Sequence, residues 1–566
     1  MRIEGRWEES WHPLLEPIRH LHERIRNSVV SALERSDLEE MSRVAKDGDG
    51  DTIYAVDRVS EEGIVFSPSI SRSCKKPPPR SIFPRMNRMM FASLAIALVS
   101  STAAANDLKD DPRVQTALGL LEIWAEAEMA YADIPAVSMA VVHDQEVLWT
   151  HGFGFADRER KAEASADTIY SVCSISKLFT AIGVLQLRDQ GKLELDDPVS
   201  QHLPWFDIQQ SFPDAPPITV RGILTHSAGL PRESDHPYWT YPEYSFPTRE
   251  EILSRLSEQK TLYPEGRYFQ YSNLGLTLAG EIVAQVAGEP YAAYSRRHIL
   301  DPLGLKDTST EIPVEHRGGR FAMGYGGKRR EGGREPLTFF QVKGIAPAAG
   351  YASTVLDLAR FASWQFRLLQ NGGEEVLEAS TLREMHRVHW VDPDWKTTWG
   401  LGFSVSRRDD KTFVGHGGSC PGFRSDLLLQ TKEKFAAVSM TNANDADASA
   451  FTRNAYRVVA PAIAEAAAAP EKIQAPDPSL KRYVGTYRNG WGGEIAVFAW
   501  QDGLAMLYLP TDNPIESLEP LKLTGENRFR RVRKDDGELA EEVVFTVENG
   551  KVTRFTRHSN HFPRVR

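Results

Sequence analysis

Apolar positions along the chain follow two spacings, and each spacing predicts a kind of element. Between residues 177 and 188 they recur every three to four residues, which predicts a buried helix. The same spacing covers Asp111 to Met129, where Asp111 is placed to cap a helix and Pro112 suits its first turn. Helical patterns also cover Val220 to Leu224 and Leu274 to Ala287.

Segments of strand character lie between these helices. Ala136 to Val142 and Val147 to Thr150 are rich in apolar and β-branched residues, and the polar residues His143 to Glu146 form the turn between them. Arg267 to Gln270 and Thr412 to Val414 also have the composition of strands. Helices and strands together predict one large α/β unit over residues 107–465.

The pattern changes beyond a Pro/Ala-rich segment, which predicts a helical tail and then a linker over residues 466–480. Short strands separated by turns follow over residues 481–566 and predict a small all-β barrel or sandwich. The expected strands are Tyr483–Tyr487, Glu494–Phe498, Leu504–Tyr508, Arg528–Val532, Glu542–Thr546 and Val552–Thr556.

Residues 1–85 differ from the rest of the chain. They contain a stretch of helical periodicity with many charged residues, an Asp/Gly run from Lys46 to Arg58, and a basic, Pro-rich stretch. The run lacks the terminal glutamate of an EF-hand, which favours a solvated loop over a calcium site. The segment faintly resembles the opening of an inositol-monophosphatase-like chain, but the later metal-binding segments of such an enzyme are not found. We interpret it as an atypical extension.

Residues 86–105 show the three parts of a secretory signal peptide. Met86-Asn-Arg88 is a basic start, Met89 to Val99 is apolar, and Ala103-Ala-Ala105 supplies small residues for cleavage. A membrane span needs about 20 residues, so a buried core helix or an uncleaved anchor are the alternatives. We expect translation from Met86 and a periplasmic or secreted protein without a stable membrane span after cleavage. N-terminal sequencing of the exported protein tests this hypothesis.

Composition, charge and motif content argue against several classes of function. The 566 residues carry a net charge of −10 at pH 7, which argues against a nucleic-acid partner because phosphate binding needs a basic face. Cys74, Cys173 and Cys420 form neither a disulfide framework nor a zinc-binding spacing, and no His-Glu-x-x-His occurs. We expect no metal and no other cofactor.

Ser174-Ile-Ser-Lys177 is the candidate catalytic motif. If the helix begins at the serine, positions i and i+3 share a face and the lysine amine reaches the serine hydroxyl. Such a pair supplies a nucleophile and a base without histidine, and the helix N-terminus adds free N–H groups. Ser73-Cys-Lys-Lys76 and Ser257-Glu-Gln-Lys260 have the same pattern, so a serine beside a surface lysine is the alternative.

Two further short motifs follow in order. Tyr271-Ser-Asn273 precedes the helical pattern that starts at Leu274, and His416-Gly-Gly-Ser419 follows the strand-like Thr412 to Val414. Each is weak alone, but their order and structural setting are informative.

With these motifs the chain resembles the serine β-lactamase and penicillin-binding-protein family. The similar branch holds class C β-lactamases, D-alanyl-D-alanine carboxypeptidases, D-aminopeptidases and related esterases. The resemblance covers roughly residues 110–460 and implies an antiparallel sheet flanked by helices with a helical subdomain; the C-terminal strands resemble the β-barrel appended to some members. Further matching segments are Leu224-Thr-His-Ser-Ala-Gly-Leu230, Ala349 to Arg360, Trp399-Gly-Leu-Gly402 and His416 to Phe423.

The resemblance implies a serine hydrolase that works through an acyl-enzyme. Ser174 attacks a carbonyl, neutral Lys177 takes its proton, and Tyr271 passes a proton to the leaving group. The oxyanion lies between the backbone N–H groups of Ser174 and Ser419. Asn273 hydrogen-bonds Lys177 or the substrate's amide.

The His416 motif bears on substrate choice. Gly417 and Gly418 are expected to keep the strand edge clear so that substrate lies alongside it. Many β-lactam-recognising relatives carry lysine at the position of His416, and a histidine near pH 7 is mostly neutral. This departure favours peptidase or esterase action over β-lactam hydrolysis. The expected substrate is a small molecule or peptide with an ester, an amide or a D-amino acid.

Cys173 and Cys420 flank Ser174 and Ser419 in sequence. If the mechanism brings these segments together, the two thiols lie close. A disulfide in an oxidising periplasm is one alternative, and two reduced, buried thiols are the alternative that we favour.

A non-catalytic penicillin-binding or sensing module of the same fold is the competing function. The intact Ser174, Lys177 and Tyr271 favour an enzyme. An α/β-hydrolase is disfavoured because no Gly-x-Ser-x-Gly is present. Arg232 to Pro247 is predicted as a long loop near the pocket, and Arg317 to Pro336 as a mobile surface loop.

Overall fold

The computed structural model describes residues 44–46, 53–54, 108–469 and 477–566. The chain divides into two units, residues 1–101 and 102–566. In the first unit, β1 (Val44–Lys46) pairs antiparallel with β2 (Ile53–Tyr54). The predicted signal peptide and nearly all of the N-terminal extension lie outside the described residues.

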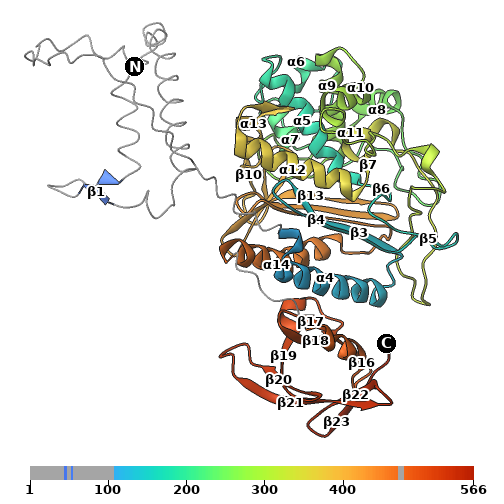
Figure 1. The fold of residues 1–566 in the computed structure, drawn as a ribbon. Helices are drawn as coiled ribbons and strands as arrows, with labels where there is room; N and C mark the ends of the chain where they lie inside the picture. Colours follow the sequence, from blue (N-terminus) through green and yellow to red (C-terminus); the bar gives the residue numbers. More distant parts are fainter. Residues whose placement is uncertain (1–43, 47–52, 55–107, 470–476) are drawn as a thin grey trace, which may run out of the picture. The chain divides into compact units, whose positions relative to one another are not determined.

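A nine-stranded antiparallel sheet is the centre of the second unit, as Figure 1 shows. Strands from the two ends of this region meet in its middle, where β15 pairs with β3. In the order in which they pair, the strands are β10 (Trp390–Val391), β11 (Thr398–Trp399), β12 (Ser404–Arg408), β13 (Lys411–Cys420), β14 (Phe423–Gln430), β15 (Phe435–Thr441), β3 (Ala136–His143), β4 (Glu146–Asp157) and β5 (Ala162–Glu163).

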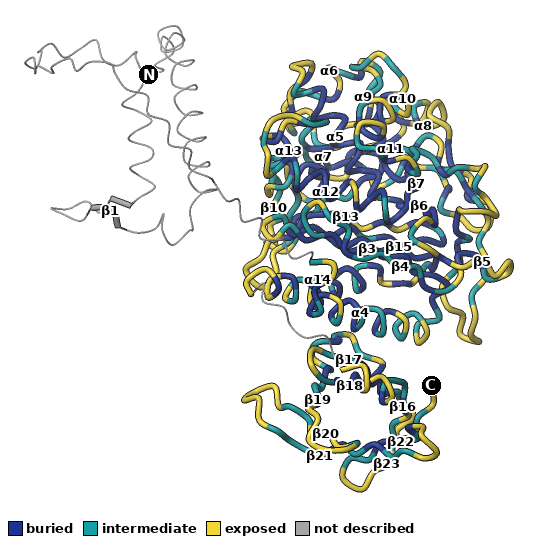
Figure 2. The backbone as a smooth tube through the Cα atoms, viewed as in Figure 1, coloured by how far each residue is buried: buried dark blue, intermediate teal, exposed yellow. Residues whose placement is uncertain are grey.

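Both faces of this sheet are covered by helices. Along β3, Ala136 and Ala140 join the core under the helical part, while the intervening Val137 and Met139 join the core under α4 (Pro112–Tyr131) and α14 (Ala448–Ala468). Successive side chains of a strand point to opposite faces, so a continuous apolar run fits a strand buried on both sides. Figure 2 shows the same strands as buried.

The remaining helices gather on the face opposite α4 and α14 (Figure 1). Two small two-stranded sheets lie in this part, β6 (Tyr170–Ser171) with β7 (Ala352–Ser353) and β8 (Glu374–Glu375) with β9 (Leu377–Glu378). The helices are α5 (Ser176–Asp189), α6 (Val199–His202), α7 (Val220–Leu224), α8 (Arg249–Arg255), α9 (Asn273–Ala287), α10 (Tyr291–Ser295), α11 (Ala346–Ala349), α12 (Val355–Asn371) and α13 (Ala379–Met385).

The C-terminal part is an eight-stranded antiparallel barrel that is nearly closed. Its first strand meets the residues after its last, where Val565 N–H donates to Thr486 O at 2.7 Å. A short helix, α15 (Pro514–Ser517), precedes the fourth strand. The strands are β16 (Gly485–Arg488), β17 (Glu494–Trp500), β18 (Gly503–Leu509), β19 (Leu518–Gly525), β20 (Arg528–Val532), β21 (Leu539–Glu548), β22 (Lys551–Arg557) and β23 (Asn560–Pro563).

The barrel packs against α4 and α14 through a shared apolar core. Phe498 and Leu507 of the barrel belong to the same buried cluster as Trp124 of α4 and Phe451 of α14. The indole N–H of Trp124 also donates to Thr511 O at 2.7 Å. None of the helices in the described residues is long and apolar enough to cross a membrane.

The fold confirms the predicted mixed architecture and most of the helices. Asp111 caps α4 by accepting from Arg113 N–H at 2.9 Å, and α7 and α9 lie where the apolar spacing predicts them. The predicted strand Arg267 to Gln270 is wrong, because these residues form no strand. Two barrel strands, β19 and β23, had no counterpart among the expected segments.

Candidate active site

Ser174 lies in a single 3₁₀ turn, η2 (Cys173–Ile175), which leads directly into α5. The serine therefore precedes the α-helix rather than starting it. The turn is tied to the segment near β7, since Val172 N–H donates to Tyr351 O at 2.9 Å and Tyr351 N–H donates to Ser176 Oγ at 2.9 Å. These bonds place the Ser174 side chain at the surface of a buried turn.

Lys177 is fully buried on the first turn of α5. Its amine lies 3.1 Å from Ser174 Oγ, 2.8 Å from Asn273 Oδ1 and 2.7 Å from Ala348 O. Burial lowers the pKa of Lys177 well below its ordinary value, and the carboxylate of Glu233 offsets part of that effect. The low pKa favours a neutral amine, which is the form that accepts a proton.

Tyr271 immediately precedes the N-cap of α9 and faces the serine. Burial raises the pKa of its phenol above the ordinary value, and the nearby Ser174 side chain offsets part of that effect. The Lys177 amine lies 4.8 Å from the ring centroid. The ring of His226 packs against Tyr271 at 4.3 Å between centroids, and His226 Nδ1 accepts from Ser272 N–H at 3.1 Å. The phenol ring is thus contacted by the Lys177 amine and by the His226 ring.

Asn273 is occupied at both ends of its amide. Its Oδ1 accepts from Lys177, while its Nδ2 donates to the two carboxylate oxygens of Glu233 at 2.9 and 3.0 Å. Glu233 also accepts from Tyr238 OH. The sequence analysis expected Asn273 to hydrogen-bond either Lys177 or the substrate's amide, and the structure shows the bond to Lys177.

His416 lies inside β13 and is 5% exposed. Its Nδ1 donates to Gly417 O at 2.6 Å, and its Nε2 has no protein partner. Burial lowers the pKa of His416 to about 3, so the ring is neutral at pH 7. Position 416 therefore supplies no fixed positive charge.

The β13 edge beyond Gly415 is free, because β12 pairs with β13 only as far as that residue. Cys420 and Phe423 flank a two-residue hairpin loop and exchange hydrogen bonds, so the next pair, Ser419 and Arg424, does not. The N–H of Ser419 consequently points away from β14, toward the free edge. This is the direction that the proposed oxyanion donor needs.

The two glycines of this motif differ in what surrounds them. A Cβ at Gly418 would lie 2.2 Å from both Val172 O and Ser425 Oγ. A Cβ at Gly417 would meet nothing closer than Asp426 Oδ1 at 3.5 Å. Gly418 is therefore required by the close approach of the nucleophile turn, a reason that the sequence pattern did not indicate.

Cys173 and Cys420 form a disulfide across 247 residues of sequence. The favoured expectation of two reduced thiols is wrong. The bridge is possible because the nucleophile turn and the end of β13 lie side by side, with Cα atoms 5.8 Å apart.

A cleft of about 580 Å³ opens over Ser174. The predicted long loop lines one side of it through Arg232, Glu233, Trp239, Tyr241 and Tyr244, as expected of a segment near the pocket. The other linings come from α9, α11, the β13–β14 hairpin and two loops. They are Asn273, Gly327, Ala349, Ser419, Cys420, Pro421, Arg424, Asn444 and Asp445.

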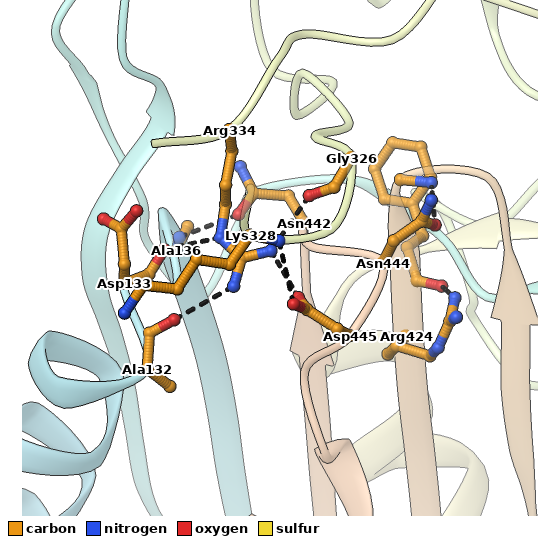
Figure 3. A network of polar contacts seen from close by, with 12 residues as sticks. Ala132, Asp133, Ala136, Gly326, Lys328, Arg334, Arg424, Asn442, Asn444 and Asp445 are labelled. Atoms are coloured by element: carbon orange, nitrogen blue, oxygen red, sulfur yellow. Dashed lines mark hydrogen bonds and ion pairs between the residues drawn. The ribbon is translucent and has the colours of Figure 1, made fainter. Parts of the chain in front are cut away.

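The segment from Arg317 to Pro336 is anchored at this end of the cleft. The Arg334 side chain is 2% exposed and donates to Ala132 O and Gly326 O, each at 2.9 Å. It also pairs with Asp445, as Figure 3 shows. The buried Arg334 guanidinium ties this part of the segment to the end of α4 and to the loop after β15. The mobility of the segment stays a prediction.

Three residues of the site escaped the sequence analysis. His226 lies in Leu224 to Leu230, a segment that resembles the family, and this resemblance could have marked it as a residue of the site. Glu233 and Arg424 lie in loop and strand positions where no motif marked them. No group of three or more metal-ligating side chains comes together in the part of the chain that the structure describes.

A serine–lysine turn beside the free edge of a helix-covered antiparallel sheet defines a protein of the β-lactamase fold class. The beta-lactamase family model matches residues 122–462, more than half of the chain, and the chain belongs to this family. Family membership indicates a hydrolase. A second model, a domain of unknown function (DUF3471), matches residues 469–564.

Curated relatives are distant. Beta-lactamase-like protein 2 of Dictyostelium discoideum is 24% identical over 431 residues, which cover 72% of this chain and 77% of that protein. Protein flp of Staphylococcus aureus (strain MW2) is 25% identical over 328 residues, which cover 56% of this chain and 62% of its own length.

Solved structures share the fold. The octameric penicillin-binding protein homologue from Pyrococcus abyssi matches with a TM-score of 0.54 at 24% identity, over 79% of this chain and 99% of that one. The beta-lactamase/D-alanine carboxypeptidase from Yersinia pestis matches with a TM-score of 0.52 at 22% identity, over 62% of this chain and 99% of that one. At these identities the likeness shows the fold alone.

Proposed function

We propose that the protein is a serine hydrolase that cleaves an ester or amide through an acyl-enzyme on Ser174. The observation that carries the proposal is the buried Lys177 amine 3.1 Å from Ser174 Oγ. Since burial lowers the pKa of Lys177, the amine accepts the proton as the serine oxygen attacks.

Tyr271 and the strand edge complete the cycle. The Tyr271 side chain lies beside Ser174, so its hydroxyl relays the proton to the leaving group as the tetrahedral intermediate collapses. The N–H groups of Ser174 and Ser419 stabilise the oxyanion, and removal of one such donor typically costs about 3 kcal/mol. Water then hydrolyses the acyl-enzyme with the same groups acting in reverse.

Peptidase or esterase action is preferred over β-lactam hydrolysis. The neutral ring of His416 lacks the charge with which a lysine there would attract a substrate carboxylate. The amide of Asn273 is already occupied by Lys177 and Glu233. The neutral His416 supports a substrate other than a β-lactam, while the occupied Asn273 amide bears equally on β-lactam and peptide substrates.

We also propose that the protein acts in the periplasm or outside the cell. The predicted signal peptide motivates this localisation, and the Cys173–Cys420 disulfide supports an oxidising compartment.

Hydrolysis of p-nitrophenyl acetate and labelling by a fluorescent penicillin test the function. The Ser174→Ala variant should lose at least about 10³-fold in kcat/KM. Ser257→Ala is the matched control, because Ser257 stands in another Ser-x-x-Lys pattern and is exposed. Its turnover should be unchanged. A wild-type protein that neither turns over nor becomes acylated would favour the non-catalytic module instead.

A further inference from the structure

The Cys173–Cys420 disulfide joins the two segments that carry the proposed oxyanion donors. Cys173 immediately precedes Ser174, and Cys420 immediately follows Ser419. Each sulfur is therefore attached one residue away from a donor N–H. Few other positions for a covalent link would constrain the spacing of the two donors so directly.

The backbone at Cys173 adds to this argument. Its φ angle is 51°, in the left-handed region that residues other than glycine seldom occupy. Such a conformation persists where the surroundings enforce it. The peptide unit that follows Cys173 carries the Ser174 N–H, so this conformation sets the direction of the donor.

Further contacts join the residues just before the turn to the sheet through side chains. Ser425 Oγ donates to Val172 O at 2.9 Å, and Ser171 Oγ lies 3.3 Å from Cys420 Sγ. Gly418 lets the turn approach without a Cβ in the way. Hydrogen bonds of this kind permit small displacements that a covalent bridge does not.

We propose that the disulfide between Cys173 and Cys420 positions the two halves of the oxyanion hole, so that acyl transfer depends on the oxidation state of these cysteines. The inference rests on the proposed function and adds a redox dependence to it. The cysteines act as positioning residues, because neither sulfur takes part in acyl transfer.

One end of the bridge borders the cleft. Cys420 lines the cleft and is 5% exposed, whereas Cys173 is fully buried. A dithiol reductant attacks one sulfur as a thiolate, forms a mixed disulfide and then closes to its own cyclic disulfide. The protein gains two electrons and two protons and holds two thiols, while the dithiol is oxidised.

Reduction should lower kcat more than it raises KM. The oxyanion forms only after attack, so its donors stabilise the transition state rather than the bound ester. A displacement of about 1 Å at a reacting centre can cost about 10²-fold. We expect kcat for p-nitrophenyl acetate to fall about 10- to 100-fold, with KM changing less than about 3-fold.

The experiment uses the full-length Cys74→Ser protein, in which Cys173 and Cys420 are the only cysteines. Denatured without reductant, this variant should show no free thiol; two thiols would overturn the inference. Dithiothreitol is then added to the native protein, and turnover, thiol content and near-UV circular dichroism are followed together. The expected loss of kcat should accompany the appearance of two thiols while the spectrum of the folded protein persists.

A second readout separates positioning from general destabilisation. A boronic acid inhibitor adopts a tetrahedral adduct on Ser174, so its affinity should fall by the same factor as kcat/KM on reduction. The Cys173→Ser/Cys420→Ser variant should have the kcat and the boronate affinity of the reduced protein. Dithiothreitol should change neither value in this variant. Full reduction without loss of kcat or of boronate affinity would refute this inference alone. An oxidised protein with no ester turnover would refute the proposed function and this inference with it.

Discussion

At the residue scale, the site is organised by what surrounds the Lys177 amine. Three oxygen atoms, from Ser174, Asn273 and Ala348, lie within 3.1 Å of it. Burial lowers its pKa, while Glu233, which reaches it through Asn273, raises it. The balance between these opposing effects decides the pH at which the amine becomes neutral.

Replacing Glu233 should therefore move the pH dependence of activity. The proposed base works when neutral, so kcat/KM rises as the pH increases through the lowered pKa of Lys177. Glu233→Gln removes a negative charge that raises this pKa. The acid limb of the kcat/KM profile should shift to lower pH.

Glu243→Gln is the control for this shift, because Glu243 lies exposed in the same loop. Its pH profile for p-nitrophenyl acetate should coincide with that of the wild type. An acid limb that moves to higher pH in Glu233→Gln would contradict the assignment of Lys177 as the base.

At the element scale, the close approach of η2 to β13 assembles the site. Val172 and Ser425 occupy the space where a side chain of residue 418 would lie. Ser419 N–H points to the free edge because of its place in the hairpin. The relation between one turn and one strand end thus sets the nucleophile and oxyanion positions together.

A Gly418→Ala substitution should damage this approach. The added methyl group would lie 2.2 Å from Val172 O, and overpacking of this kind costs about 1–3 kcal/mol. Urea unfolding should show the loss, and ester turnover should fall with it.

Gly417→Ala provides the stability control in the neighbouring position, since its new methyl group would keep 3.5 Å from the nearest atom. Its unfolding midpoint should stay near that of the wild type. Equal stability of the two variants would argue against steric contact between the turn and β13.

At the scale of the whole molecule, the barrel covers an apolar surface of the hydrolase part. Phe498 is 4% exposed in the cluster that it shares with α4 and α14. The cleft lies on the opposite face of the sheet, beside α5 and α9. The barrel is therefore expected to contribute to stability more than to chemistry.

Truncation of Phe498 should separate these two contributions. Phe498→Ala should destabilise the protein by about 3 kcal/mol, since it leaves a cavity in a shared core. Differential scanning calorimetry should show the lower melting temperature, with KM for p-nitrophenyl acetate unchanged. Trp491→Ala, at a side chain that is 98% exposed in the same barrel, should change neither value. A loss of turnover in folded Phe498→Ala would show that the barrel shapes the cleft.

Much of this arrangement follows from local patterns. The spacing of apolar residues predicted α7 and α9 because a helical face repeats within a few residues. The prediction of a strand at Arg267 to Gln270 failed because backbone N–H groups of this segment donate to loop and side-chain acceptors rather than to a neighbouring strand. Phe269 N–H donates to the Asp392 carboxylate and Gln270 N–H to His226 O, each at 2.7 Å.

The sequence by itself determined the motifs, their order and the chemistry of a serine beside a lysine one helical turn away. Tertiary structure alone decided three things: the oxidation state of Cys173 and Cys420, the occupied amide of Asn273, and the burial that lowers the pKa values of Lys177 and His416. The physical reason is common to all three. A disulfide, a hydrogen-bond partner and a burial-driven pKa shift depend on atoms that are distant in sequence, and only the folded chain brings these atoms together.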